Sequence, residues 1–496
     1  MAKLSKFLKS FDDNLVRILV GFFIFLVPLW PKLPFKTIDY TYIAIRFEDF
    51  YVALISIVFV IQLLRKKVII NKQFAWLFGL FWFAVGLSTA WGIFVSKTIQ
   101  FPHLGVLHFL RRIEYMFPFF IAASVVRNKK DFFQMFGLYM LSVLFVVIYA
   151  LGQKFLNFPA VQTMNPEYAK GYLLYLTPEA RISGTFAGHY DLASYLVMSI
   201  PMVLGYFFQT GKKKFAWLFV GALIVLIYTS SRISFGAYVV ATLAFLIWIR
   251  KYLFTVFVIV LTAALVLTTG ELTSRFLKTL QVRRILVDDR TGAVYVGQTI
   301  TTKELPAGSF YVPLKDQSNK GAPPVDLDAL RARVIKEKIA EASAAGQVIT
   351  DSLKDQIAAS ATANLKPVNT VVSDISFATR LQVEWPRAIA AFKKNVILGT
   401  GPSSITEATD NDYLRWIGEM GLFGTLSFLG LLAMIVKKTW RKDYVSYGFI
   451  FGLGALLINA SYIDVFEASK VAYSFWTIAG LYIGYYTLKN SKNEAK

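Results

Sequence analysis

The chemistry that this chain could perform is indicated by arginines and carboxylates that lie outside the apolar runs or at their ends. The arginines are Arg181, Arg232, Arg380 and Arg415. Asp410 and Asp412 flank Asn411 directly before one apolar run. A guanidinium group can bind a phosphate or a carboxylate through two parallel hydrogen bonds, and a carboxylate can accept a proton from a hydroxyl group. These residue types predict a site that binds an anion and moves a proton.

Several residues could be the proton acceptor. The candidates are Asp410, Asp412, Glu407, Asp191 and His189. Carboxylate and imidazole groups can both take a proton from a hydroxyl group if the geometry allows it. Asp410 and Asp412 also have the residue type and the position of helix N-caps, so capping is the alternative for each of them.

The sequence gives no sign of metal or nucleotide chemistry. The chain has no cysteine, and its three histidines are too scattered to form a zinc motif. The turn 399–404 is rich in Gly and Ser, but it lacks the Gly-Lys-Ser/Thr ending of a nucleotide-binding loop. We therefore expect no metal ion and no cofactor at the site.

The elements that must position these residues are transmembrane helices. The chain has 496 residues, is 56% hydrophobic and has a mean hydropathy of +0.52. It contains twelve apolar runs, and a helix that spans a bilayer needs about 20 residues. The cores of the runs are 14–30, 49–64, 74–95, 104–126, 132–153, 189–209, 215–229, 233–249, 252–269, 413–436, 445–463 and 468–487. The pattern predicts an all-α polytopic membrane protein with about twelve transmembrane helices.

The distribution of Lys and Arg predicts the orientation of these helices. With the N-terminus in the cytoplasm, 23 Lys and Arg fall in segments on the cytoplasmic side and 9 fall in the short loops on the other side. Loops on the cytoplasmic side of membrane proteins are enriched in these residues. Both termini are therefore predicted to be cytoplasmic, in a multi-pass protein of the cytoplasmic (inner) membrane. The net charge of +22 is mostly this topology signal, which argues against binding of nucleic acid.

Two long loops on the outer side define the predicted organisation of the chain. The predicted parts are residues 1–269 with helices one to nine and an outer loop near 154–188, residues 270–412 as a large extracytoplasmic insert, and residues 413–496 with the last three helices and a cytoplasmic tail. Within the insert, the alternating stretch 293–300 predicts strands, and the charged, Ala-rich stretch 326–363 predicts solvated helices. The insert could be a cover or a spacer, or it could bind substrate.

Charged residues also occur within the predicted spans and at their outer ends. Arg111, Arg112 and Glu114 lie inside the fourth apolar run, where charges usually face the protein interior or a watery cavity. They predict either a buried structural ion pair or a substrate role for Arg112. With the predicted topology, Arg181 and Arg232 lie at the outer membrane surface. A lipid diphosphate would be a natural ligand at that depth, and the alternative is that the arginine snorkels to lipid headgroups or caps a carbonyl.

Three segments resemble the O-antigen ligase and O-antigen polymerase superfamily. The segment RISGTFAGHYDLASYL begins at Arg181, and YTSSRISFGAY contains Arg232 in a turn between two spans. The third segment matches an ordered pattern through Arg380, Trp385, Ala388, Gly399, Gly401, Asn411, Tyr413, Leu414, Gly421 and Gly424. The resemblance covers the membrane part of the chain, and the insert at 290–370 lies outside it.

The resemblance implies a multi-span glycosyltransferase. Such enzymes take a glycan from a polyprenyl diphosphate on the outer face of the cytoplasmic membrane and pass it to an acceptor lipid or to another glycan, without an obligatory metal. Arginines that match Arg181 and Arg232 are implicated in engaging the diphosphate. The further candidates for substrate binding are Arg380, Asn411, Tyr413, Arg415, Arg112 and Asp191, and the candidates for catalysis are Asp410, Asp412 and His189.

One departure from the pattern bears on the activity. Ligases of the superfamily typically have a His, their proposed base, directly before the Asn of the Asn-x-Tyr-Leu motif, and this chain has Asp410 there. The position favours Asp410 as the base and leaves both a ligase and a polymerase open.

A secondary transporter or flippase with twelve spans is the alternative from another class. Transporters often have two related halves with broken helices near the middle of the bilayer. In this chain the polar residues collect at the outer ends of the spans, and both long loops lie on one side. These features favour the enzyme, whose expected partners are a polyprenyl-diphosphate-linked glycan, its acceptor and membrane lipids.

The topology can be tested with single cysteines, because the chain has none of its own. We expect an impermeant maleimide to label Ser318→Cys in intact spheroplasts and to label Ser491→Cys only after the membrane is permeabilised. The unmodified chain is the control for background labelling. Labelling of Ser491→Cys in intact spheroplasts would reverse the predicted orientation.

Overall fold

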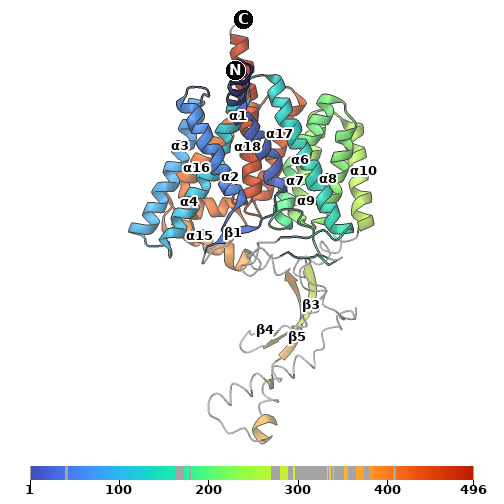
Figure 1. The fold of residues 1–496 in the computed structure, drawn as a ribbon. Helices are drawn as coiled ribbons and strands as arrows, with labels where there is room; N and C mark the ends of the chain where they lie inside the picture. The colour runs from blue at the N-terminus through green and yellow to red at the C-terminus, as the bar shows by residue number, and fades with distance from the viewer. Residues whose placement is uncertain are drawn as a thin grey trace.

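Long helices run side by side in one bundle, and both termini lie at the same end of it (Figure 1). The structure is a computed structural model of the chain. It describes residues 2–38, 43–161, 173–177, 180–269, 280–288, 294–295, 332, 335–336, 339, 351–355, 365–373, 380–405 and 409–494.

The helices of the bundle follow the apolar runs of the sequence. They are α1 (Ala2–Leu29), α2 (Phe47–Leu64), α3 (Lys72–Ala90) continued by η1 (Trp91–Val95), α4 (Pro102–Met116), α5 (Pro118–Val125), α6 (Lys129–Phe155), α7 (His189–Thr210), α8 (Lys214–Tyr228), α9 (Arg232–Trp248), α10 (Tyr252–Thr269), α16 (Asp412–Thr439), α17 (Tyr444–Ala460) and α18 (Ser469–Glu494). The fourth run is divided into α4 and α5, because Pro118 has no backbone N–H for the helical ladder.

The lengths of these helices agree with a membrane protein. Among the described residues, six helices are long and apolar enough to cross a membrane, and three further apolar helices are shorter. The chain is thus a mostly helical, multi-pass membrane protein, and twelve as the number of spans stays a prediction.

Glycine allows α7 and α17 to approach each other closely. A Cβ atom at Gly448 would lie 2.7 Å from the carbonyl oxygen of Pro201, and one at Gly452 would lie 2.5 Å from that of Met198. Small residues let two membrane helices pack backbone against backbone. This contact holds α7 and α17 together, and residues of the candidate site lie at the start of α7 and just after the end of α17.

A kink in α16 shapes the region that precedes this helix. Gly421 has φ 61° and ψ −165°, a combination that essentially only glycine adopts. The turn 396–401 fills the interruption, since the N–H groups of the two residues after Gly421 donate to carbonyls of this turn at 2.8 and 3.0 Å. In return, the Gly401 N–H donates to the Glu419 carbonyl at 2.9 Å. The turn is thereby attached to the first half of α16.

Short strands lie at the end of the bundle opposite the termini (Figure 1). β1 (Pro34–Thr37) pairs antiparallel with β2 (Ala44–Arg46). In the insert, the antiparallel order is β4 (Val294–Tyr295), β3 (Leu280–Asp288) and β5 (Leu365–Ser373). β4 falls within the predicted strand stretch 293–300, whose other residues lie outside the described ones. In the stretch 326–363, residues 351–355 are helical and most of the others also lie outside the described residues.

The insert is followed by two short helices that lead to α16. They are η3 (Arg380–Glu384) and α15 (Trp385–Lys394). α15 packs on α16 through Ala388, because a Cβ atom at Gly418 would lie 2.8 Å from the Ala388 carbonyl oxygen. The last part of the predicted insert, 270–412, therefore rests on the bundle. The division of the chain into three parts stays a prediction.

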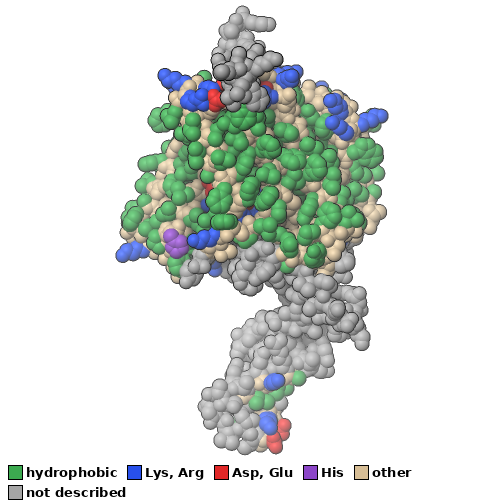
Figure 2. Space-filling view, in the orientation of Figure 1, with side chains coloured by type: hydrophobic (Ala, Val, Ile, Leu, Met, Phe, Trp, Pro, Cys, Tyr) green, Lys and Arg blue, Asp and Glu red, His purple; other side chains and the backbone are tan. Residues whose placement is uncertain are grey.

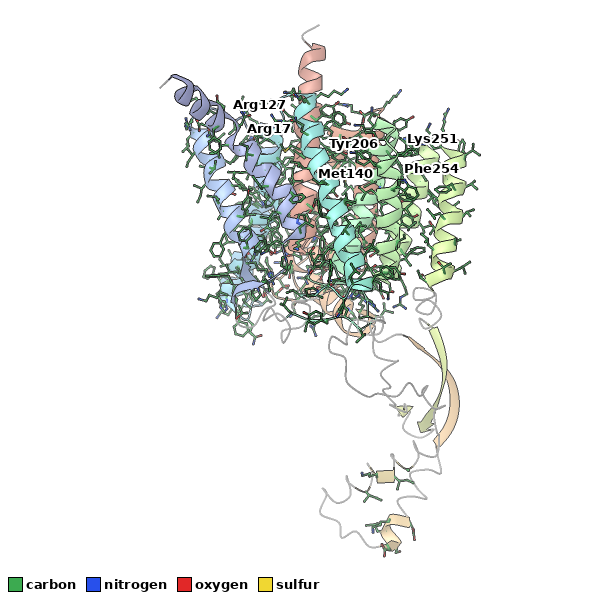
Figure 3. All side chains as sticks on the ribbon, turned by 45° about the vertical axis from the view of Figure 1, so that its right-hand side comes forward. Arg17, Arg127, Met140, Tyr206, Lys251 and Phe254 are labelled. Carbon is green, nitrogen blue, oxygen red and sulfur yellow. The ribbon has the colours of Figure 1, made fainter. Side chains whose placement is uncertain are left out.

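Basic side chains mark the end of the bundle that carries the termini. Lys and Arg gather there, and hydrophobic side chains cover the middle of the bundle (Figure 2). Arg17, Arg127 and Lys251 lie at this end (Figure 3). The insert strands lie at the other end (Figure 1). This arrangement puts both termini and these basic residues on one side, as the predicted topology requires, and the assignment of that side to the cytoplasm stays a prediction.

Replacement of Gly421 by Ala should destabilise the protein by about 3 kcal/mol, because the side chain adds strain at positive φ and crowds the core. A Cβ atom there would lie 2.3 Å from the Ile397 carbonyl oxygen. The measurement is thermal unfolding of the purified protein in detergent. Gly430→Ala is the matched control on the same helix, since a Cβ atom there meets nothing within 4 Å. Equal melting temperatures of both variants and the unmodified chain would contradict the role of the kink.

Candidate active site

The Asp464 carboxylate joins the loop between α17 and α18 to the turn before α16. It accepts the backbone N–H groups of Thr409, Asp410 and Asn411 at 3.0, 3.0 and 3.1 Å. Arg415 donates to it as well, at 2.9 Å. Hydrogen bonds to a charged group are stronger than those between neutral groups. Asp464 therefore fixes the turn before α16. This turn leads into the acidic cluster, by which we mean Asp410 and Asp412.

Asn411 is the N-cap of α16. Its side-chain oxygen accepts the Leu414 N–H at 3.0 Å. The Asp412 side chain is fully buried and instead accepts two backbone N–H groups of the α17–α18 loop, at 2.8 and 3.2 Å. The capping alternative for Asp410 and Asp412 is therefore wrong. Asp412 links the helix to the loop, which leaves it poorly placed to meet a substrate.

Asp410 is the member of the acidic cluster whose side chain keeps access to solvent. This side chain is 32% exposed, and its Oδ2 lies 2.6 Å from Arg380 Nη2. The backbone φ of 50° is in the left-handed region, which is uncommon for a residue with a side chain. Burial raises the pKa of Asp410 to about 6, and the charge of Arg380 opposes the rise. This carboxylate can accept a proton near neutral pH.

Two tyrosine rings bring arginines from distant segments together. The Arg380 guanidinium carbon lies 4.1 Å from the centre of the Tyr462 ring and 5.9 Å from that of Tyr190. Arg181 lies 5.8 Å from the same Tyr190 ring, and its guanidinium also hydrogen-bonds to His189 Nε2. The structure thus places Arg181, His189 and Arg380 in one group beside the start of α7.

The Arg181 side chain is buried, and its position at the outer membrane surface stays a prediction. It is 5% exposed, because its guanidinium faces inward to His189 and Tyr190. The snorkelling alternative is therefore wrong for this residue. A buried arginine in contact with aromatic rings is held in one orientation, which suits directional binding of an anion.

The charge of Arg232 acts on Tyr462, whose ring Arg380 contacts. Arg232 is the first residue of α9 and is partly buried. Burial raises the pKa of Tyr462, and the charges of Arg380 and Arg232 both oppose this rise. This electrostatic effect is the link between Arg232 and the group. We refer to Arg181, Arg232 and Arg380 as the arginine cluster.

A buried ion network connects α4, α16 and the α17–α18 loop. Arg112 lies 2.6 Å from Glu419 and 2.8 Å from Glu467, and Arg415 lies 3.5 Å from Glu419. Buried charges are costly unless they are paired, and these pairs balance the charges of Arg112 and Arg415 within the protein. The ion pair predicted within the fourth apolar run is also present: Arg111 Nη1 lies 3.2 Å from Glu114 Oε2.

Asp191 and Tyr413 are further predicted substrate-binding residues that do not join the arginine cluster. Asp191 lies in the first turn of α7, where the charges of Lys32 and Lys470 act on it. Tyr413 donates its hydroxyl to a carbonyl of α17 at 2.9 Å. The structure thus uses Tyr413 to attach α16 to α17, and it places Asp191 in a second group of charges.

Sequence reasoning missed several residues of this region. They are Tyr190, Glu384, Tyr462, Asp464 and Glu467. The two acidic residues of the α17–α18 loop carried a signal, since carboxylates between two apolar runs need partners. Of the predicted bases, Glu407 lies outside the described residues. Among the residues that the structure describes, no group of three or more His, Asp and Glu could hold a metal ion. Independence from metal stays a prediction.

The comparison with known families bears on the class of the protein. A family model described as O-antigen ligase matches residues 217–429, which include Arg232, Arg380 and Asp410. The match supports placing the chain in the O-antigen ligase superfamily and confirms the resemblance predicted from the motifs. Together with the apolar helices, it indicates a multi-pass membrane enzyme of the O-antigen ligase or polymerase type. No curated protein matches the chain.

Proposed function

We propose that this protein is a membrane glycosyltransferase that moves a glycan from a polyprenyl-diphosphate carrier to an acceptor on the outer face of the cytoplasmic membrane. The observation that carries the proposal is the arginine cluster. The guanidinium groups of Arg181 and Arg380 come from segments far apart in the sequence and meet at Tyr190, beside the partly exposed carboxylate of Asp410, and the charge of Arg232 acts on Tyr462, which Arg380 also contacts. A diphosphate is the kind of anion that several guanidinium groups bind through paired hydrogen bonds.

The proposed reaction assigns a role to each group. The arginine cluster binds the diphosphate and stabilises the negative charge that it gains as a leaving group. Asp410 takes the proton of the acceptor hydroxyl, whose oxygen forms a bond to the anomeric carbon of the glycan. The bond between that carbon and the diphosphate oxygen breaks at the same time. His189 positions Arg181 through their hydrogen bond.

The acceptor separates a ligase from a polymerase, and both use the same donor. In a ligase the acceptor hydroxyl belongs to a different lipid or glycan, and in a polymerase it belongs to another lipid-linked repeat. The proposal includes the predicted orientation, with the termini in the cytoplasm and residues 270–412 outside. A flippase would need polar groups along a path through the bundle, whereas the arginine cluster lies near the ends of helices.

Deletion of the gene tests the function as a whole. We expect the deletion strain to lose mature glycan and to accumulate the lipid-linked donor on the outer face of the membrane. Complementation with the unmodified chain should restore the glycan profile. Accumulation of the donor on the inner face would identify a flippase and contradict the proposal.

The arginine cluster can be tested by exchange of Arg for Lys. Arg181→Lys and Arg232→Lys keep the charge but lose the paired hydrogen bonds, and we expect each to lower the transfer rate at least about 100-fold. The alanine variants should be inactive. The measurement is transfer by full-length protein in membranes, normalised to the amount of folded protein. Arg65→Ala is the control, since this arginine is 48% exposed and pairs with Asp12 outside the cluster. Full activity of the Arg232 variants would remove this residue from the site.

The role of Asp410 can be tested with Asn and His. Asp410→Asn leaves the Asn411 cap intact and removes the proton acceptor, so we expect a loss of about 10²–10⁴ in rate without a change in folding. Asp410→His should keep part of the activity. In the unmodified chain the rate should fall as the pH is lowered through about 6, because protonated Asp410 cannot act as a base. Transfer by Asp410→Asn at the unmodified rate would show that the base lies elsewhere.

A further inference from the structure

A groove of about 600 Å³ lies between α1 and α6. Apolar side chains of both helices line most of it, among them Ile18, Phe22, Leu138 and Leu141. Gly21 also lines the groove and lets the two helices approach each other, since a Cβ atom there would lie 3.2 Å from a methyl carbon of Leu138. Because polar groups lose hydrogen bonds to water in such surroundings, the lining selects a hydrocarbon chain over a polar ligand.

One end of the groove is polar and basic. Asn14 and Arg17 line this end and precede the apolar lining residues of α1. Arg17 Nη1 lies 2.8 Å from Asp131 Oδ1, and Arg17 also donates to the Gln134 side chain. The Arg17 side chain is still 25% exposed, and it lies at the end of the bundle that carries the termini (Figure 3). The groove thus combines an apolar part along a helix long enough to cross a membrane with a basic end near the start of that helix.

Lys130 adds a positive charge at the same end. It is the second residue of α6, and Lys130, Gln134 and Leu138 recur at intervals of four residues, which places them on one face of the helix. Gln134 binds Arg17, and Leu138 lines the groove. The exposed Lys130 side chain therefore belongs to the helix face that borders the groove.

The charge that this end offers to a ligand is positive. Each acidic residue of α1 and α6 already has a basic partner at 2.8 Å or less: Asp131 with Arg17, Asp12 with Arg65 and Asp13 with Lys67. Further basic residues at the start of α6 are exposed, namely Arg127, Lys129 and Lys130. This arrangement is complementary to an anionic headgroup and not to a cation.

We propose that the groove binds an anionic phospholipid, with its phosphate at Arg17 and Lys130 and an acyl chain along the apolar lining. Basic pockets between membrane helices are known binding sites for anionic lipid headgroups, and here the apolar part of the groove also matches the rest of the lipid. With the predicted orientation, the basic end faces the cytoplasmic leaflet of the membrane. The inference goes beyond the proposed glycan transfer and does not depend on it.

The test is the binding of phosphatidylglycerol to the full-length protein in detergent, measured by native mass spectrometry. Phosphatidylcholine with the same acyl chains is the comparison, because its headgroup has no net charge. We expect phosphatidylglycerol to bind at least about fivefold more tightly. It should also raise the melting temperature of the protein, because a ligand that binds only the folded state stabilises that state.

Replacement of Lys130 by Gln tests the basic end without breaking a buried ion pair. We expect Lys130→Gln to weaken the binding of phosphatidylglycerol about fivefold, which is the contribution of one basic residue near a membrane surface. Lys251→Gln is the control, since Lys251 is exposed at the same end of the bundle but directly before α10, away from Arg17 (Figure 3). Its affinity should equal that of the unmodified chain.

Replacement of Leu141 by Trp tests the apolar part. The larger ring takes volume that the acyl chain needs, so we expect Leu141→Trp to weaken the binding of phosphatidylglycerol at least about fivefold. Leu144→Trp is the matched control on the same helix, because Leu141 and Leu144 are 40% and 38% exposed and only Leu141 lines the groove. A general effect of Trp on α6 would appear in both variants.

Several outcomes would overturn the proposal. Equal affinity for the two lipids would do so, as would unchanged affinity for phosphatidylglycerol in both Lys130→Gln and Leu141→Trp. Displacement of phosphatidylglycerol by inorganic phosphate would show a site for a free anion. A dimer in detergent that Leu141→Trp dissociates would show that a second copy of the chain occupies the groove. All of these measurements leave the proposed glycan transfer untouched, so the two proposals fail separately.

Discussion

One carboxylate, Asp464, holds together the parts of the chain on which the site depends. It binds three consecutive N–H groups before α16 and the guanidinium of Arg415 on that helix. Asn411 adds a further link, since its amide donates to the Ser461 carbonyl at 2.9 Å. Removal of one partner of a buried ion pair typically costs about 3–5 kcal/mol. The position of Asp410 in space is therefore a consequence of contacts made by a loop some fifty residues later in the chain.

The buried charges of the bundle serve two different purposes. In the network of Arg112, Glu419 and Glu467, each charge is paired over a short distance and joins helices to one another. In the arginine cluster, aromatic rings supply much of the contact, with Tyr190 between Arg181 and Arg380. Aromatic faces orient a guanidinium group in addition to its polar partners, which here are His189 for Arg181 and Asp410 for Arg380. The partly exposed carboxylate of Asp410 beside the cluster is the reason to propose the cluster, and not the network, for the binding of an anion.

Backbone contacts within α16 and in the segment before it fix the positions of the site residues. The kink at Gly421 leaves two backbone N–H groups of α16 without partners in the helix, and carbonyl oxygens of the turn 396–401 accept hydrogen bonds from them. α15 then packs against α16, which places η3 and its residues Arg380 and Glu384 near the start of the same helix. A residue larger than glycine at the kink would collide with the turn. The conformation of this segment is thus set by backbone contacts rather than by the charged side chains themselves.

Local patterns in the sequence were enough for the class of the protein and for part of the site. Apolar runs of sufficient length indicate membrane helices because the bilayer leaves backbone polar groups no other partners, and the motifs around Arg181, Arg232 and Arg380 predicted the family. The tertiary structure decided which charged residues meet. It placed Asp191 among other charges, made Asn411 the N-cap of α16 and buried the Arg181 side chain. It also brought residues to the site that the sequence patterns did not indicate, namely Tyr190, Tyr462, Asp464 and Glu384. These contacts join residues far apart along the chain, and helix packing, which no local spacing encodes, determines them.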